Sequence, residues 1–213
     1  MQIIPAILAT NEKDYKDKLF KVSNNEFLED GWVQIDLMDN KFVQNKSIEP
    51  KIIKKYPSSL KIEAQLMVEY PENWIDQLVT NKVDRIIFPV EDSEGTKERI
   101  AHVRNHGVEV GLSINPRTSI ETLDPFVATI DVALLMSVEP GFGGQNFIAD
   151  TYQKVKSLKS KGWSIKLGVD GGIEPEIARQ LSKLEVDYIV VGSHLIEGDI
   201  DENLEIFWQA IKA

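Results

Sequence analysis

The 213-residue chain has no cysteine, and this absence excludes disulfide bonds and thiolate metal sites. Long hydrophobic runs are also missing, because no apolar stretch approaches the roughly 18 residues that a membrane-spanning helix needs. Positive charge is scarce: 24 lysines and arginines stand against 34 aspartates and glutamates. The net charge of −10 argues against nucleic acid and anionic membranes as partners, although a small pocket can still be locally positive.

Histidine is also scarce, with three residues in the whole chain. His102 and His106 lie four residues apart, on or just beyond a predicted helix, where we expect a solvated face rather than a metal pair. His194 follows a glycine–serine turn, so it would either touch a phosphate group or pack in the turn. The lack of cysteine fits a reducing cytoplasm, and the apolar start of the chain, which has no basic lead-in, is interpreted as a strand. We therefore expect a cytoplasmic protein.

Apolar, β-branched segments recur at intervals of roughly 20 to 35 residues, as repeated β–α units require. Eight of them are predicted as strands: Ile3–Leu8, Val33–Leu37, Lys61–Val68, Arg85–Val90, Glu109–Ile114, Val132–Val138, Ile165–Val169 and Tyr188–Val191. The amphipathic segments between them are predicted as helices: Asp14–Phe27, Trp74–Val79, Lys97–Asn105, Thr151–Lys161, Pro175–Leu184 and Asn203–Ala210. Asn11 and Pro175 are predicted helix starts, as is Thr118 with Glu121 three residues later.

Eight β–α units in 213 residues favour an α/β fold, a single (β/α)8 TIM barrel over residues 1–213. A doubly wound open sheet is the alternative, but it would use fewer strands at this length. No linker or low-complexity tract divides the chain. In a barrel of this kind, chemistry sits at the carboxyl ends of the strands, and phosphate commonly binds after strands seven and eight.

Glycines follow three of the predicted strands in the last third of the chain. The residues concerned are Gly141, Phe142, Gly143 and Gly144, then Gly171 and Gly172, then Gly192 and Ser193. Glycine lets backbone N–H groups approach a ligand closely, and a helix start adds a positive dipole end. Each turn alone would be explained without a ligand. Three of them converging at one end of a barrel predict a phosphate site.

Two carboxylates stand at strand ends, Asp36 on the second strand and Asp170 on the seventh. Around a ring of eight strands these positions are three steps apart, so the pair is expected to face across the mouth. Opposed carboxylates suit removal of a proton from one face of a carbon beside a carbonyl and delivery to the other face. Asp39 lies past the strand and is expected to orient the loop.

Three methionines, Met38, Met67 and Met136, lie at or near the ends of strands two, three and six. Methionine usually fills gaps in a core. At one end of a barrel, three of them would also form an apolar floor that excludes water from a reactive intermediate.

These stretches together resemble the ribulose-phosphate 3-epimerase family of ribulose-phosphate-binding barrels. The motifs that carry the resemblance are "IIPAILAT" at 3–10, "IDLMDNKFVQN" at 35–45, "QLMV" at 65–68, "GLSINPRT" at 111–118, "LLMSVEPGFGGQNFI" at 134–148, "VDGGI" at 169–173 and "VVGS" at 190–193. The resemblance implies interconversion of ribulose 5-phosphate and xylulose 5-phosphate, a step of pentose phosphate metabolism, with a divalent metal stabilising the enediolate. It also implies that Asp36 is the base and Asp170 its partner acid, and that the glycine loops contact phosphate.

The chain departs from the family at the metal ligands. Gln34 and Gln65 stand where the family has histidine, and Ala6 stands where the family has a substrate-contacting serine. Imidazole is a good ligand for Zn, Mn or Fe(II), whereas an amide oxygen is a poor one. Asp36 and Asp170 alone would bind such a metal only weakly.

Three interpretations follow from these departures. The glutamine amides donate hydrogen bonds to the developing oxyanion in place of a metal, or the substrate has changed, or epimerase activity is lost and phosphosugar binding remains. The first makes the chain an epimerase that uses two aspartates, with a weakly held metal or none. A decarboxylase or aldolase on the same barrel is disfavoured, because "LKIEAQLMV" lacks the acidic and lysine array of such decarboxylases. Barrels of this kind often form symmetric homo-oligomers, and we expect one here.

Overall fold

The computed structural model describes residues 1–28, 31–91 and 94–213. Eight parallel strands close into a barrel in which each strand pairs with its neighbours in chain order and β8 pairs with β1. The strands are β1 Gln2–Ile7, β2 Trp32–Met38, β3 Lys61–Met67, β4 Arg85–Pro89, β5 Glu109–Ile114, β6 Val132–Met136, β7 Lys166–Asp170 and β8 Tyr188–Val191. The predicted (β/α)8 barrel is confirmed, and all eight predicted strands are present, with ends that differ by at most two residues.

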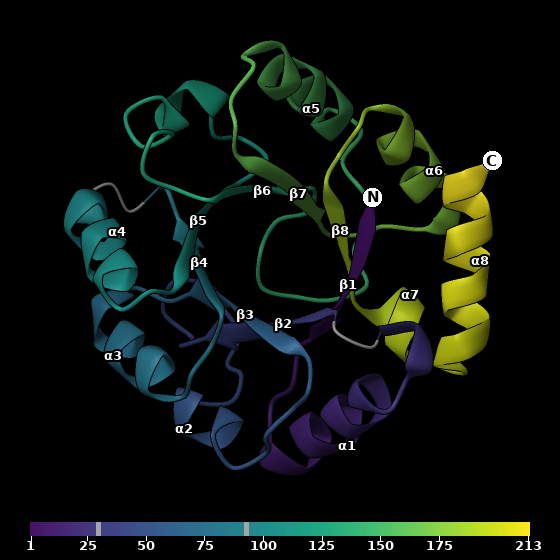
Figure 1. Cartoon of the computed structure of the whole chain (residues 1–213), viewed down its shortest axis with the longest axis horizontal. Coiled ribbons are helices and arrows are strands. Elements are labelled where there is room, and N and C mark those ends of the chain that lie inside the picture. The colour runs from purple at the N-terminus through teal and green to yellow at the C-terminus, as the bar shows by residue number, and fades with distance from the viewer. Residues whose placement is uncertain (29–30, 92–93) are drawn as a thin grey trace.

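Helices surround the barrel on its outer side (Figure 1). They are α1 Glu12–Ser23, α2 Pro50–Ile53, α3 Glu72–Thr80, α4 Thr96–Asn105, α5 Thr151–Ser160, α6 Pro175–Lys183, α7 Ser193–Ile196 and α8 Ile200–Lys212, with 3-10 turns η1 at Glu26–Leu28 and η2 at Ile120–Leu123. Within the described residues, no helix is long and apolar enough to cross a membrane.

Of the three predicted helix starts, two are confirmed and one is wrong. The side chain of Asn11 accepts a hydrogen bond from the Asp14 backbone N–H at 3.0 Å, and Pro175 opens α6, so both predicted starts are confirmed. The start predicted at Thr118 is wrong, because only the 3-10 turn η2 follows and no side chain caps it. The predicted helix Asp14–Phe27 is too long: α1 ends at Ser23, and η1 follows as a separate turn.

Most of the core lies in two parts, because strands in a closed barrel are covered on both faces, and a small third cluster contains Met38, Val43 and Met67. Aliphatic side chains between strands and helices form the larger part, and a second cluster fills the barrel interior. The interior cluster contains Ile4, Ala6, Trp32, Ile87, Val132, Leu134, Met136, Tyr188 and Val190. These side chains close the barrel centre between its two ends.

Polar side chains interrupt the apolar interior at two levels. At the lower level, Arg85 is 2% exposed, and its guanidinium lies 2.6 Å from a carboxylate oxygen of Glu63 and 2.6 Å from one of Glu109. The Trp32 ring stacks on the same guanidinium at 4.0 Å. The upper level holds Asp36, Asp170 and the two glutamines.

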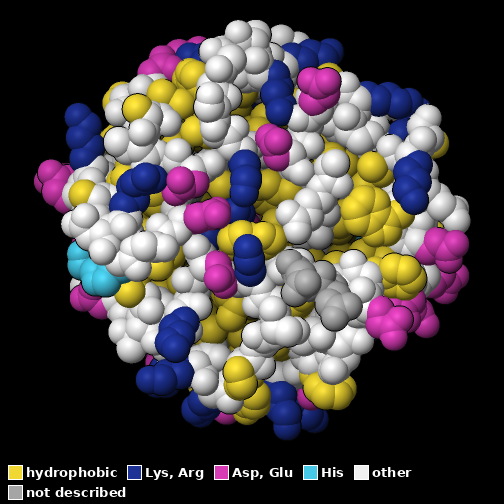
Figure 2. Space-filling view, in the orientation of Figure 1, with side chains coloured by type: hydrophobic (Ala, Val, Ile, Leu, Met, Phe, Trp, Pro, Cys, Tyr) yellow, Lys and Arg dark blue, Asp and Glu magenta, His cyan; other side chains and the backbone are white. Residues whose placement is uncertain are grey.

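Charges on the molecular surface are mixed. On the face shown in Figure 2, acidic and basic side chains alternate with apolar ones and do not gather into one basic patch. This distribution fits the acidic composition of the chain, with a pI near 4.9.

Candidate functional site

A cavity of about 430 Å³ opens at the carboxyl ends of the strands. Its walls come from β1, β2, β3, β6, β7 and β8, and the segment between β6 and α5 crosses its opening (Figure 1). We call it the mouth cavity. It is lined by all eight predicted phosphate-loop residues, namely Gly141, Phe142, Gly143, Gly144, Gly171, Gly172, Gly192 and Ser193. It is also lined by Asp36, Asp170, Gln65, Met38, Met67, Met136 and Ala6.

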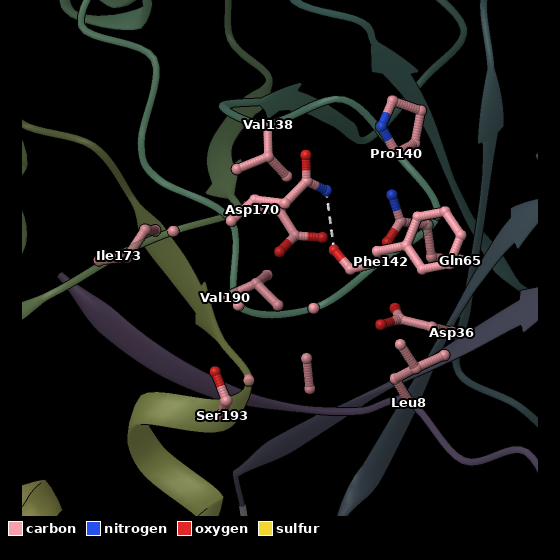
Figure 3. A pocket seen from close by; sticks show the side chains of 18 of the residues that line it. Leu8, Asp36, Gln65, Val138, Pro140, Phe142, Asp170, Ile173, Val190 and Ser193 are labelled. Atoms are coloured by element: carbon pink, nitrogen blue, oxygen red, sulfur yellow. Dashed lines mark hydrogen bonds between the residues drawn. The ribbon is translucent and has the colours of Figure 1, made fainter. Parts of the chain in front are cut away.

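Asp36 and Asp170, the carboxylate pair, are half-buried in the wall of this cavity. Asp36 lies on β2, and Asp170 is the last residue of β7. Figure 3 shows both side chains reaching into the same space. Inward-pointing side chains converge on the barrel axis, so the two carboxylates lie closer together than three steps around the ring would suggest.

Gln34 joins the carboxylate pair. Its Nε2 lies 2.8 Å from Asp36 Oδ1 and 3.0 Å from Asp170 Oδ2, and donates to both. The same nitrogen lies 2.8 Å from Oε1 of Gln65. Gln34 is completely buried and lies beneath the cavity floor, so it contacts the carboxylate pair rather than the cavity itself.

Gln65 is the register partner of Asp36 on β3 and does line the cavity. As placed, its Nε2 donates to Met136 Sδ at 3.1 Å, and its Oε1 faces the carboxylate pair. A half-turn of the amide brings the nitrogen to 3.2 Å from Asp36 Oδ1 and 3.0 Å from Asp170 Oδ2. Either orientation is chemically sensible, depending on whether one of the acids carries a proton.

Burial shapes the acidity of the carboxylate pair. It raises the pKa of Asp36 to about 7, and the negative charge of Glu63 adds to the rise, while the hydrogen bond from Gln34 works against it. The pKa of Asp170 is raised well above its ordinary value by burial, by the neighbouring Asp36 charge and by Glu63. Two close carboxylates resist losing both protons, and such a pair can offer one acid and one base.

The donor set does not fit a tightly held transition metal. Within residues 1–28, 31–91 and 94–213, no group of three or more histidine, cysteine, aspartate and glutamate side chains is placed to hold a metal ion. The point between the two carboxylates, where a bridging cation would bind, is taken by the Gln34 amide nitrogen, which has no lone pair to offer a metal.

Two of the glycine turns that line the cavity, those after β6 and β7, lie against each other. Gly172 has a φ of +60°, and a Cβ there would stand 2.5 Å from the Phe147 backbone nitrogen. Only glycine therefore lets the turn after β7 approach the segment after β6 so closely. By contrast, a Cβ at Gly143 would meet nothing within 4 Å, so that glycine faces open space.

Several side chains near the cavity were not predicted from the sequence. Asn45 donates from Nδ2 to the Gly141 carbonyl at 2.6 Å, and Gln145 donates to the Phe142 carbonyl at 2.8 Å (Figure 3). Lys18 of α1 reaches the rim and donates to the Leu8 carbonyl at 2.7 Å. The asparagine and glutamine stand inside the motifs quoted above, which was an available signal, whereas nothing in the sequence pattern around Lys18 indicates its position.

The three histidines and Asp39 can now be placed relative to the cavity. His102 and His106 lie on and just past α4, away from the cavity, and His102 pairs with Asp76 at 2.7 Å. Asp39 accepts hydrogen bonds from the backbone N–H groups of Lys41, Phe42 and Glu69, so it orients the loop after β2. His194 lines the cavity, with its ring 3.7 Å from Glu174.

Comparison with known proteins agrees with these features. A family model described as "Ribulose-phosphate 3 epimerase family" matches residues 2–196. The ribulose-phosphate 3-epimerase of Chlamydia muridarum is 37% identical over 175 residues, which cover 78% of this chain and 77% of the relative. The ribulose-phosphate 3-epimerase of Eremothecium gossypii is 30% identical over 204 residues, which cover 90% of this chain and 84% of the relative. The crystal structure of 3-hexulose-6-phosphate synthase from Salmonella typhimurium superposes with a TM-score of 0.73 at 16% identity, and the match covers 100% of this chain and 99% of that one. It shows the same fold.

Proposed function

Because the chain belongs to the ribulose-phosphate 3-epimerase family, we propose that it epimerises a phosphorylated ketose, with ribulose 5-phosphate and xylulose 5-phosphate as the expected pair. The observation that carries the proposal is the carboxylate pair, held by one amide nitrogen at 2.8 and 3.0 Å in the wall of the mouth cavity. One member can act as a base while the other acts as an acid.

The proposed reaction moves two protons at the third carbon of the sugar. The Asp36 carboxylate removes the proton from one face of C3, and the C–H electron pair forms the C2=C3 bond of an enediolate. Asp170, protonated at the start, then delivers its proton to the opposite face of C3 as the carbonyl re-forms. The carboxylate pair holds one proton before and one proton after the reaction, so the step is balanced.

The rest of the cavity supports a phosphosugar. Backbone N–H groups at the glycine loops are proposed to hold the phosphate group, which fixes the distance from the phosphate to C3. Met38, Met67 and Met136 surround the carboxylates with apolar surface, which shields an enediolate from water. We propose no step through a bound transition metal, because the donor set does not fit one.

The direct test is conversion of ribulose 5-phosphate by the purified protein, followed by proton NMR of the product. We expect conversion by the wild type and a loss of at least about 10²-fold in kcat for Asp36→Asn and Asp170→Asn, since each removes one proton-transfer group. Asp17→Asn, a change at an exposed aspartate of α1, is the matched control and should behave as the wild type. Full activity in either active-site variant would remove that residue from the mechanism.

A second function is favoured by one set of residues. Ala6 in the cavity wall and the two glutamines differ from the residues that the family resemblance implies, which fits an altered sugar phosphate or binding without turnover. Calorimetric binding of ribulose 5-phosphate without any conversion would support this second function. We also propose that the protein acts in the cytoplasm. We propose further that it forms a symmetric homo-oligomer, and light scattering of the purified protein would test this oligomeric state by measuring the mass of the assembly.

A further inference from the structure

The two buried glutamines carry an inference that rests on the proposed function and deepens it. We infer that Gln34 and Gln65 together do the work of a bound cation in this site. Gln34 is a positioning residue that holds the carboxylate pair, and Gln65 is a catalytic residue that donates an N–H hydrogen bond to the ketose oxygen as negative charge develops there.

The position of the Gln34 nitrogen is the first support. It lies 2.8 Å from Asp36, 3.0 Å from Asp170 and 2.8 Å from Gln65, so one NH2 group with two protons faces three acceptor atoms. A group in that place keeps the two carboxylates a fixed distance apart and partly neutralises them. A bridging cation would do the same.

The oxygen of the same amide is the second support. Oε1 of Gln34 is buried and has no hydrogen-bond partner among the described residues. Its register partner on β3, Glu63, also has one buried carboxylate oxygen without a partner and offers no hydrogen when ionised. Unpaired buried oxygens destabilise the fold, so an amide here is poorly explained by stability alone. Turning the amide over would aim its oxygen at both carboxylates, so the nitrogen stays toward them.

The surroundings of Gln65 give it a different role. It lines the mouth cavity, whereas Gln34 does not. As placed, its amide nitrogen donates to the thioether of Met136 at 3.1 Å, and a thioether is a weak acceptor. A developing oxyanion is a far stronger acceptor, so the Gln65 N–H would donate to it instead of to the thioether. Oε1 of Gln65 would then accept the hydrogen bond from whichever acid is protonated.

Each amide N–H is placed to donate to the atom that carries negative charge at one stage of the proposed reaction. When Asp36 takes the C3 proton, the carbonyl electron pair moves to the C2 oxygen, and Gln65 donates to that oxygen. When Asp170 gives up its proton, negative charge passes from the C2 oxygen to Asp170. The Gln34 nitrogen is within hydrogen-bond distance of both acids, so it can donate to whichever one is ionised at each stage.

The test compares rates of ribulose 5-phosphate epimerisation before and after chelation of metals, in the wild type and in variants. We expect the wild-type rate to survive chelation. Gln65→Met, which keeps size and removes the donor, should lower kcat about 10²- to 10³-fold with KM nearly unchanged. Gln65→Leu, which also removes the donor, should lose as much and covers the case in which Gln65→Met folds poorly. Gln77→Leu, at an exposed position of α3, is the matched control.

Gln34 is tested by the pH dependence of the rate, which would not change if Gln34 had only a structural role. Gln34→Leu should lower kcat and shift the acid limb of the pH–rate profile to higher pH, because the carboxylates lose their N–H donor. The double variant Gln34→His, Gln65→His should become dependent on added Mn²⁺, Zn²⁺ or Fe²⁺, since it restores imidazole ligands beside the two acids.

The outcomes separate the two levels of the proposal. A wild type that epimerises only with metal and stops on chelation would overturn the inference and leave the epimerase function intact. Unchanged kcat in folded Gln65→Met and Gln65→Leu would also overturn it. A wild type that is inactive both with and without metal would overturn the proposed function, and the inference with it.

Discussion

At the scale of single residues, the site depends on two acids that share one environment. Asp36 and Asp170 are both half-buried, and both face the buried Glu63 one level below. Burial and like charge disfavour ionisation, and so they keep one proton on the pair at a pH at which an exposed aspartate would have lost it. The same features that destabilise the charged site would suit it to the proposed acid–base chemistry.

This shared environment predicts a bell-shaped pH dependence of kcat/KM. Below about pH 7 the base becomes protonated, because the pKa of Asp36 is raised to about 7, and the rate should fall. At higher pH the pair loses its last proton, because the pKa of Asp170 lies well above its ordinary value, and the rate should fall again. The limbs belong to the pair as a whole. A rate that is constant between pH 5 and 9 would contradict this account.

The sequence predicts these acids but not what holds them. Asp36 and Asp170 could be found because carboxylates at the ends of two apolar strands must reach the barrel mouth. The contact between Gln34 and Asp170 joins residues 136 positions apart on strands that are not neighbours, and no local pattern encodes it. Gln34 was expected to line the site, whereas it lies below it.

At the scale of elements, the segment between β6 and α5 forms one wall of the site. Asn45 holds it through the Gly141 carbonyl, Val43 packs on Gly141, and Gly172 lies against its backbone. Contacts from two other βα loops thus fix a glycine-rich segment that would otherwise be loose. This pre-organisation would reduce the entropy lost on binding the proposed phosphosugar.

A pair of alanine substitutions tests this packing. Gly172→Ala places a side chain at φ +60° and 2.5 Å from the Phe147 backbone nitrogen, so it should destabilise the protein by about 1–3 kcal/mol and raise KM. Gly143→Ala meets nothing within 4 Å and should leave the melting temperature unchanged. Thermal unfolding by circular dichroism measures both, and equal melting temperatures for the two variants would contradict the packing described here.

All eight strands and the longer helices were predictable, whereas the shortest helices were not. The eight strands are predominantly apolar runs, since both faces are covered, and such runs stand out against the polar helices even where single polar residues interrupt them. The short helices α2 and α7 were missed, because four residues give no helical periodicity. The end of α1 was missed because Phe20 and Phe27 continue an apolar pattern, although both are exposed.

At the scale of the whole molecule, we propose that residues 1–213 fold as one domain around the closed barrel. The lower polar level contributes to this unity, because Arg85 of β4 links Glu63 of β3 and Glu109 of β5, and Tyr188 of β8 donates to Glu63 at 3.3 Å. Three adjacent strands and one across the barrel are joined by one guanidinium and the carboxylate that it pairs with.

Breaking this link should destabilise the whole barrel in one step. Arg85→Met leaves Glu63 buried without its cation, and we expect a loss of about 3–5 kcal/mol. Thermal unfolding should remain a single transition at a lower temperature. Arg179→Met removes a surface pair with Glu176 and should leave the melting temperature nearly unchanged. Two separate transitions in the wild type would contradict the one-domain proposal.

The central claim is that two acids act on opposite faces of one carbon, and deuterium exchange at C3 in heavy water tests it most directly. Proton NMR would follow ribulose 5-phosphate and xylulose 5-phosphate separately with each variant. Asp170→Asn should still exchange the C3 proton of ribulose 5-phosphate without inverting it, because Asp36 remains. Asp36→Asn should exchange only xylulose 5-phosphate. If exchange and inversion are lost together for both sugars in both variants, or both persist in either variant, the two-acid account is wrong.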